Sequence, residues 1–229
     1  ADNDGIPSKL SNSPFSVSLE LTTKYMWRAI EYGDAPTSFA IINYEHKGFS
    51  AYSEGVYAFN GSHSEVDLGV AYNYKWLTVG VNDYYYPSSV GEKDHYFKLS
   101  SRKTGHYLEG AVTLAPEKIP LWLTLSTYIW GADKKPTNDK NAYSSYAEIG
   151  YSYSFNDYNV ASLAVGAALN KGFYTDYEYG FNVVNITAKY ATSFKFGKFH
   201  LPVSASYVLN PYRNKSYVTL SIYFNSKQL

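Results

Sequence analysis

The sequence predicts an all-β protein, a transmembrane antiparallel up-and-down β-barrel of about twelve strands. Apolar and polar residues alternate in segment after segment. In 217–224, Val218, Leu220, Ile222 and Phe224 are apolar and the residues between them carry hydroxyls. Because side chains of a strand point to opposite faces in turn, each segment has one apolar and one polar face. Several polar faces also carry charges, which fit a packed soluble core poorly, so we expect the apolar face outside and the polar face inside.

The composition is consistent with this class. The 229 residues include 26 Tyr, 18% aromatics and no Cys, and Tyr and Trp favour a membrane–water interface. No apolar run reaches the roughly 20 residues that a membrane helix needs, which excludes a helical membrane protein. The formal net charge is +0, so electrostatics give no reason to expect a nucleic-acid partner.

The chain divides into a lead-in and one barrel domain. Residues 1–14 contain Gly5, Pro7 and Pro14, and we expect a flexible periplasmic segment left after removal of a secretory signal. The barrel domain is 15–229. Its predicted strands are 15–29, 37–46, 49–59, 64–74, 76–86, 105–115, 120–130, 143–154, 159–169, 181–194, 199–209 and 216–225.

The connections between these segments tend to alternate between short and long, as in outer-membrane barrels with short periplasmic turns and long outer loops. With both termini on the short-turn side, the number of strands must be even. The stretch 94–101 could form further strands, so ten or fourteen strands remain open. In the second strand, Phe39 and Ile41 compete with Ala40 and Ile42 for the outward face.

Aromatic residues lie near both ends of the predicted strands, as two interface girdles would require. We assign Tyr25 and Trp27 to the loop-side interface and Tyr74 and Trp76 to the turn-side interface. The alternative is a soluble β-sandwich that buries the same aromatics. It would need shorter strands and would place acids such as Glu20, Glu65 and Asp67 on its solvent face.

The alternation directs a set of charged and aromatic residues into the lumen, where we expect them to line a pore. The predicted pore-lining residues are Glu20, Lys24, Arg28, Glu54, Glu65, Asp67, Glu109, Trp122, Glu148 and Lys189. Acids outnumber bases in this set, which favours cations or neutral polar solutes. Small inward residues on the strands from 143 to 209 are expected to leave space. Alternatively, the acids pair with the bases across neighbouring strands and close the barrel.

An enzyme would need a nucleophile and a base within reach of each other. His106, with Ser100, Ser101 or Ser144 nearby, is the candidate for a lipid-modifying site in the outer wall, but no nucleophile motif accompanies it. No His/Asp/Glu cluster has metal-ligand spacing. The sequence therefore implies no catalytic residue, no metal and no cofactor.

The first third of the chain resembles a family of bacterial outer-membrane proteins of unestablished role, the Gcw_chp type. The matching segments are 21–28 (LTTKYMWR), 33–36 (GDAP), 44–49 (YEHKGF), 65–69 (EVDLG) and Tyr72, and the resemblance covers about residues 19–86. The family usually has Gly after the Trp-Arg pair, where this chain has Ala29. The resemblance implies an outer-membrane barrel and no particular activity. Size and strand number also look like small channels for nucleosides or acidic sugars, but the acid-rich lumen argues against an anionic solute.

Together these observations predict a barrel in a bacterial outer membrane, in contact with its lipid and lipopolysaccharide. The expected function is a narrow passive channel for small polar or cationic solutes. The alternative is a non-conducting barrel whose extracellular loops bind a partner or ligand. A lipid-modifying enzyme is the third hypothesis.

Overall fold

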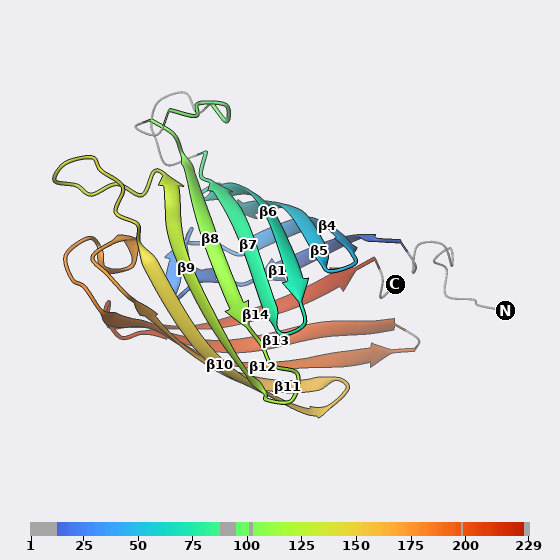
Figure 1. Ribbon diagram of the computed structural model, residues 1–229. Helices are drawn as coiled ribbons and strands as arrows, with labels where there is room; N and C mark the ends of the chain where they lie inside the picture. The colour runs from blue at the N-terminus through green and yellow to red at the C-terminus, as the bar shows by residue number, and fades with distance from the viewer. Residues whose placement is uncertain (1–12, 88–94, 101–102, 198, 227–229) are drawn as a thin grey trace.

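A computed structural model describes residues 13–87, 95–100, 103–197 and 199–226. Twelve antiparallel strands form one closed barrel (Figure 1). They are β1 (Phe15–Thr22), β4 (Thr37–His46), β5 (Phe49–Ala58), β6 (Ser64–Tyr74), β7 (Leu77–Tyr85), β8 (His106–Leu114), β9 (Leu121–Gly131), β10 (Ser145–Asn156), β11 (Asn159–Ala168), β12 (Asn182–Phe196), β13 (Phe199–Asn210) and β14 (Lys215–Asn225). The predicted fold class is confirmed, and the sandwich alternative is wrong. Most of the predicted lead-in lies outside the described residues.

The barrel closes where β1 pairs with both β4 and β14. Thr22 is the last β1 residue in either ladder, opposite Thr37 on one side and Ser221 on the other. The prediction of one strand over 15–29 is therefore wrong. After Thr22 the chain leaves the wall and forms a separate hairpin from β2 (Tyr25–Trp27) and β3 (Ile30–Tyr32). We call β2 and β3 the inner hairpin. The stretch 95–100 adds no strand to the wall.

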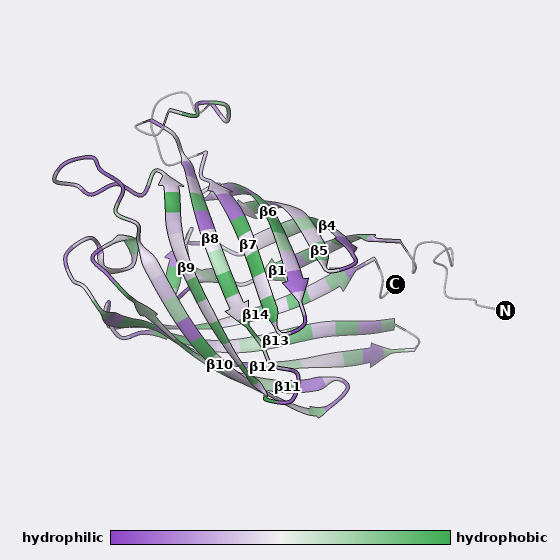
Figure 2. Cartoon of the chain, in the orientation of Figure 1, coloured by the Kyte–Doolittle hydropathy of each residue, from purple (hydrophilic) through white to green (hydrophobic). Residues whose placement is uncertain are grey.

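The two faces of the wall have opposite chemistry, and Figure 2 shows the alternation of apolar and polar residues along the strands. On β6, Leu68 and Val70 are exposed on the outside, whereas Glu65 and Asp67 are buried. On β4, Ile42 is exposed and Phe39 is buried, so Ala40 and Ile42 take the outward face. The apolar side chains that are exposed on the outside include Val17, Leu19, Ile42, Val66, Leu68, Val70, Val79, Leu125, Ile149, Leu163, Val218 and Leu220.

A β-bulge in β9 changes the direction in which Trp130 points. Strict alternation from Tyr128 would turn Trp130 inward, but Trp130 pairs with outward-facing Leu108, while Tyr128 pairs with Glu109. Ile129 is the extra residue between them. An extra residue in one strand shifts the alternation by one position, so Trp130 turns away from the lumen.

The connections lie at two ends of the barrel, which we call the turn end and the loop end. The two-residue links after β4 and β6 include Lys47, Gly48 and Lys75 with positive φ values, as tight hairpins require. A Cβ at Gly48 would lie 2.6 Å from the carbonyl oxygen of Asn73, so this turn needs glycine. Long connections 23–36, 132–144 and 169–181 lie at the loop end, as do the described residues of the connection between β7 and β8. In the described part of the chain, no helix is long and apolar enough to cross a membrane.

Several inward glycines accommodate aromatic rings from neighbouring strands. A Cβ at Gly150 would lie 1.9 Å from the Trp122 ring, and a Cβ at Gly166 would lie 1.9 Å from the Tyr146 hydroxyl. These small residues therefore do not leave open space, because aromatic side chains lie over them. The expectation of a smooth, open wall is wrong for β10 and β11.

Candidate functional site in the barrel lumen

The inner hairpin crosses the lumen at the loop end. Its turn is formed by Arg28 and Ala29, which have φ values of 50° and 57°. Two consecutive positive φ values give the tight turn that reverses a two-stranded ribbon. An ion pair between Lys24 and Glu31 links the two sides of the hairpin. Since the hairpin starts from β1 and its tip reaches Glu109 on β8, five strands away around the wall, it spans most of the barrel's width.

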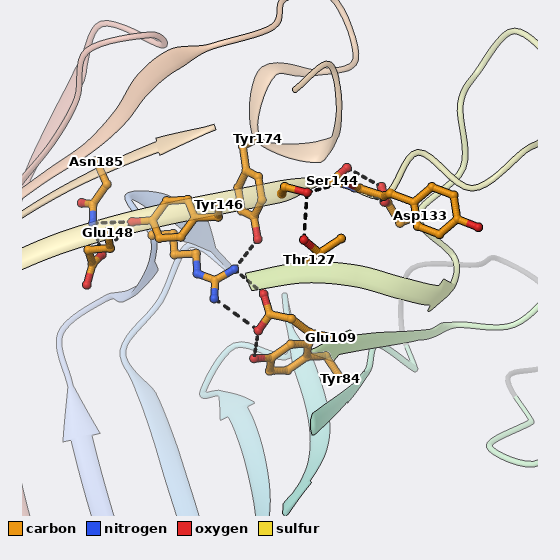
Figure 3. Close-up of polar contacts among 12 residues, drawn as sticks. Tyr84, Glu109, Thr127, Asp133, Ser144, Tyr146, Glu148, Tyr174 and Asn185 are labelled. Atoms are coloured by element: carbon orange, nitrogen blue, oxygen red, sulfur yellow. Dashed lines mark hydrogen bonds and ion pairs between the residues drawn. The ribbon is translucent and has the colours of Figure 1, made fainter. Parts of the chain in front are cut away.

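Arg28 holds the hairpin tip through a dense polar network. Its Nη1 and Nη2 donate to the two carboxylate oxygens of Glu109 at 2.5 and 3.2 Å, and Nη1 also donates to the hydroxyl of Tyr174. The hydroxyl of Tyr84 donates to Glu109 at 2.9 Å (Figure 3). The guanidinium lies over the rings of Trp27 and Tyr146, 4.3 and 4.5 Å from their centroids. A two-pronged Arg–carboxylate pair fixes orientation as well as charge.

A second segment enters the lumen from the other side. The connection after β11 contains a short helix, η1 (Phe173–Thr175), which places Tyr174 among rings of the wall. Tyr174 stacks on Tyr128 at 6.2 Å and lies 5.2 Å from Tyr146, and all three are fully buried. The inner hairpin and η1 together fill the loop end with aromatic side chains. Trp27, Ile30, Tyr32, Tyr84, Tyr86 and Tyr107 belong to the same cluster.

Beneath the inner hairpin lies an internal cavity of about 430 Å³. One side carries the carboxylates of Glu20, Glu54 and Asp67, from β1, β5 and β6. The adjoining strands β12, β13 and β14 contribute hydroxyls and one amine; these residues are Thr187, Lys189, Ser204, Ser206, Thr219, Ser221 and Tyr223. The cavity therefore combines an acidic wall with a wall of hydroxyl groups that also carries the amine of Lys189.

Six of the ten residues predicted to line a pore line this cavity: Glu20, Lys24, Arg28, Glu54, Asp67 and Lys189. The other four lie elsewhere in the interior. Glu109 binds Arg28, and Trp122 lies against Gly150. Glu65 lies 3.1 Å from Nε2 of His63, and Glu148 accepts hydrogen bonds from Tyr146 and Asn185 at 2.7 and 3.1 Å. A pore-lining role for this set stays a prediction.

The four predicted interface residues divide into two pairs. Tyr74 and Trp76 are exposed at the turn end of the wall, 60% and 51% of their surface being accessible. Tyr25 and Trp27 were assigned wrongly. They lie on the inner hairpin, where Tyr25 packs on Phe39 at 4.9 Å and Trp27 on Tyr84 at 5.5 Å. The alternation of residues 15–29 did not distinguish wall from hairpin, because a two-stranded hairpin alternates in the same way.

The inner hairpin and Tyr174 are the parts of the site that the sequence analysis missed. The alternation in 15–29 exceeds the roughly 9–11 residues in which a barrel strand crosses a membrane. Length alone gave no signal for the hairpin, however, because β12 also has 15 residues and is a single wall strand. For Tyr174 there was no signal, because it lies in a loop and only tertiary contacts turn it inward.

The structure does not assemble the hypothetical catalytic group around His106. Nδ1 of His106 lies 2.8 Å from Asp83, and Nε2 lies 2.7 Å from the carbonyl oxygen of Tyr96. Ser144 directs its hydroxyl to Asp133 at 2.7 Å instead of to His106. Ser101 lies outside the described residues. Among the residues that are described, no group of three or more His, Cys, Asp or Glu could hold a metal ion.

No protein-family model and no curated protein sequence matches this chain. Solved structures of porins do share its fold. The KdgM porin in complex with disordered oligogalacturonate has a TM-score of 0.54 at 13% identity, over 92% of this chain and 97% of that chain. The NanC porin has a TM-score of 0.54 at 12% identity, over 93% of this chain and 100% of that chain. At these identities the likeness is one of architecture, that of porin-like outer-membrane barrels.

Proposed function

We propose that this protein is a narrow passive channel for small polar or cationic solutes in a bacterial outer membrane. The observation that supports it is the acidic, hydroxyl-lined cavity inside a closed barrel. Carboxylates near a solute path attract cations at close range and repel anions. In this proposal the inner hairpin narrows the path at the loop end, and the role of the protein is transport, not catalysis.

The membrane setting is supported by the outward face of the wall. A continuous band of exposed Val, Leu and Ile is rare on a soluble monomer, because large apolar patches associate in water. In a bilayer the same band contacts lipid, and residues such as Tyr74 and Trp76 contact the interface and lipopolysaccharide. The Gcw_chp resemblance of residues 19–86 agrees with this setting, and the porin-like architecture adds to its support.

Conductance across planar bilayers tests the channel. We expect the purified protein to give small ohmic currents, with a reversal potential in a KCl gradient that indicates a preference for K⁺. Replacing both Glu54→Gln and Asp67→Asn removes two cavity charges and should reduce that preference. Glu117→Gln removes an exposed charge in the turn after β8 and should not change it. An anion preference, or no current, would contradict the channel.

One observation favours the alternative of a non-conducting barrel whose loops bind a partner. The inner hairpin and η1 fill the loop end with buried aromatic rings, while the loops themselves expose Phe97 (85%) and Phe181 (69%). If neither the wild type nor variants that release the hairpin give a current across planar bilayers, this alternative replaces the channel.

A further inference from the structure

The cavity beneath the inner hairpin has more acidic side chains than its basic side chains pair with. Lys24 is paired with Glu31, and Arg28 is paired with Glu109. Lys189, on β12, donates to the hydroxyl of Tyr223 at 3.2 Å, and Tyr223 pairs in register with Glu20. Glu20, Glu54 and Asp67 form no ion pair with any residue that the structure describes. The cations that line the cavity therefore do not neutralise its acidic wall.

Asp67 is the most buried acid of this wall. It is 4% exposed, lines the cavity and pairs in register with Glu54 on β5. Its Oδ1 is buried and has no hydrogen-bond partner among the described residues. A buried carboxylate oxygen without a donor is costly, commonly by several kcal/mol. A bound donor with positive charge would satisfy it.

Aromatic rings surround the same acids. Tyr25, Trp27, Phe39, Tyr52 and Tyr84 all line the cavity. The ladders place Asp67 opposite Tyr84 on one side and opposite Glu54 on the other, and Tyr52 lies two residues before Glu54 on the same face of β5. Ring faces attract cations, most strongly where water is excluded, and they also contact alkyl groups. Carboxylates and rings together are the chemistry that recognises an organic ammonium group.

The size and spacing of the groups argue against a bare metal ion. No three carboxylate or imidazole groups of the described residues converge as metal ligands. A volume of about 430 Å³ lies in the range of sites for small organic molecules. The acids are spread over three strands around this volume, so they suit one cation with several non-hydrogen atoms.

We propose that the cavity between the inner hairpin and strands β1, β5 and β6 binds a small organic ammonium ion. Its charged nitrogen contacts Glu54 and Asp67, and its alkyl groups contact the rings of Tyr52 and Tyr84. This inference rests on the proposed function, because it names the class of solute that the channel admits. It goes further in placing a saturable site on the path.

Calorimetric titration of the full-length barrel in detergent tests the site with two matched probes. Choline carries a trimethylammonium group, and 3,3-dimethylbutan-1-ol has the same shape with carbon in place of nitrogen. We expect saturable binding of choline and at least about tenfold weaker binding of the alcohol, because only choline gains the charge and cation–π interactions. Similar affinities for the two probes would overturn the proposal.

Two variants locate the site. Asp67→Asn and Glu54→Gln should each raise the Kd for choline by about tenfold, while Glu117→Gln should leave it unchanged. Removing one of several neighbouring acids relieves repulsion, so both variants are expected to fold, and circular dichroism checks this. If neither variant that folds changes the Kd, the proposed site is wrong.

Conductance separates this inference from the proposed function. If the barrel conducts K⁺ but binds the two probes equally, the result supports the channel and contradicts the ammonium site. If the barrel binds choline at Asp67 but passes no current, the result supports the ammonium site and contradicts the channel.

Discussion

At the residue scale, buried charges in this barrel differ in how well they are satisfied. Arg28 has a carboxylate, a phenol and ring faces within reach, and Glu109 accepts from Arg28 and Tyr84. Asp67 lies on β6, two strands from Glu109 on β8, and its Oδ1 has no hydrogen-bond partner among the described residues. A buried charge is tolerated when it is paired and hydrogen-bonded, and it is costly otherwise. The network at Arg28 is therefore structural, whereas the acids near Asp67 are available for a ligand.

Glycine at position 69 gives a prediction about inner packing. A Cβ there would lie 2.0 Å from the Tyr52 ring and 2.6 Å from Oδ1 of Asn82, and Tyr52 donates to that same oxygen. Gly69→Ala should therefore displace the ring and lower the free energy of unfolding by about 1–3 kcal/mol in urea titrations. Gly55→Ala is the control, because a Cβ there meets nothing within 4 Å. Equal stability of the two variants would contradict this packing.

Asp34, in the connection before β4, gives a prediction about pH. Hydrogen bonds from Asn60 and Ser62 lower the pKa of its carboxyl below the usual value. A lowered folded-state pKa means that the stabilisation is present above the unfolded-state pKa and is lost as the pH falls through the folded-state value. NMR titration should therefore give a midpoint below about 3.9, and Asn60→Ala should raise it. A midpoint that Asn60→Ala does not move would refute this assignment.

At the element scale, the inner hairpin determines how much of the lumen is open. β2 and β3 pair only with each other, so the wall's ladders do not hold them in place. A two-stranded hairpin is marginal by itself and needs packing against other elements. Here that packing comes from the aromatic cluster at the loop end and from the bond between Arg28 and Glu109. The hairpin's position therefore depends on a few contacts at its tip.

Arg28→Ala should release the hairpin tip. It leaves Glu109 buried without its cation, which typically costs about 3–5 kcal/mol, and we expect the single-channel conductance to increase several-fold as the lumen widens. Arg213→Ala removes a guanidinium that pairs with Asp176 in an exposed position. Such exposed pairs contribute about 0–1 kcal/mol, so this control should leave conductance and stability nearly unchanged. Wild-type conductance in Arg28→Ala would show that the hairpin does not limit the path.

At the scale of the whole molecule, the apolar exterior and the polar interior reverse the arrangement of a soluble protein. Closure of the sheet between β1 and β14 satisfies the edge hydrogen bonds that lipid could not. The charged side chains of the wall then face one another or the cavity, where water and other polar groups can stabilise them. The barrel is thus suited to a bilayer by the same alternation that makes it unsuited to water.

Arginine substitutions at two heights on β14 test whether the apolar face of the wall contacts hydrocarbon. Leu220, at the middle of the strand, and Ser216, near its loop end, both point outward. In lipid vesicles, Leu220→Arg should reduce the free energy of unfolding by about 2–4 kcal/mol, and Ser216→Arg by about 0–1 kcal/mol, because the cost of a charge falls towards the interface. If both substitutions were equally harmless, the outer face would not contact hydrocarbon.

The wall of this barrel follows from the order of the residues. Alternation in segments such as 64–74 and 216–225 predicted the strands closely, because each of these strands has one apolar side and one polar side. It also predicted which acids turn inward. In a regular strand, successive side chains point to opposite faces, so the position of a residue in the strand fixes its direction.

Tertiary structure alone decided what fills the lumen. Parity does not reveal that residues 25–32 leave the wall, that Tyr174 enters from a loop, or that an extra residue at Ile129 turns Trp130 outward. These outcomes depend on contacts between segments far apart in the chain, such as Arg28 with Glu109, 81 residues away. Local alternation indicates which side of a strand is apolar. All strands and loops share the enclosed volume, so the side chains that fill it are determined only by the closed barrel.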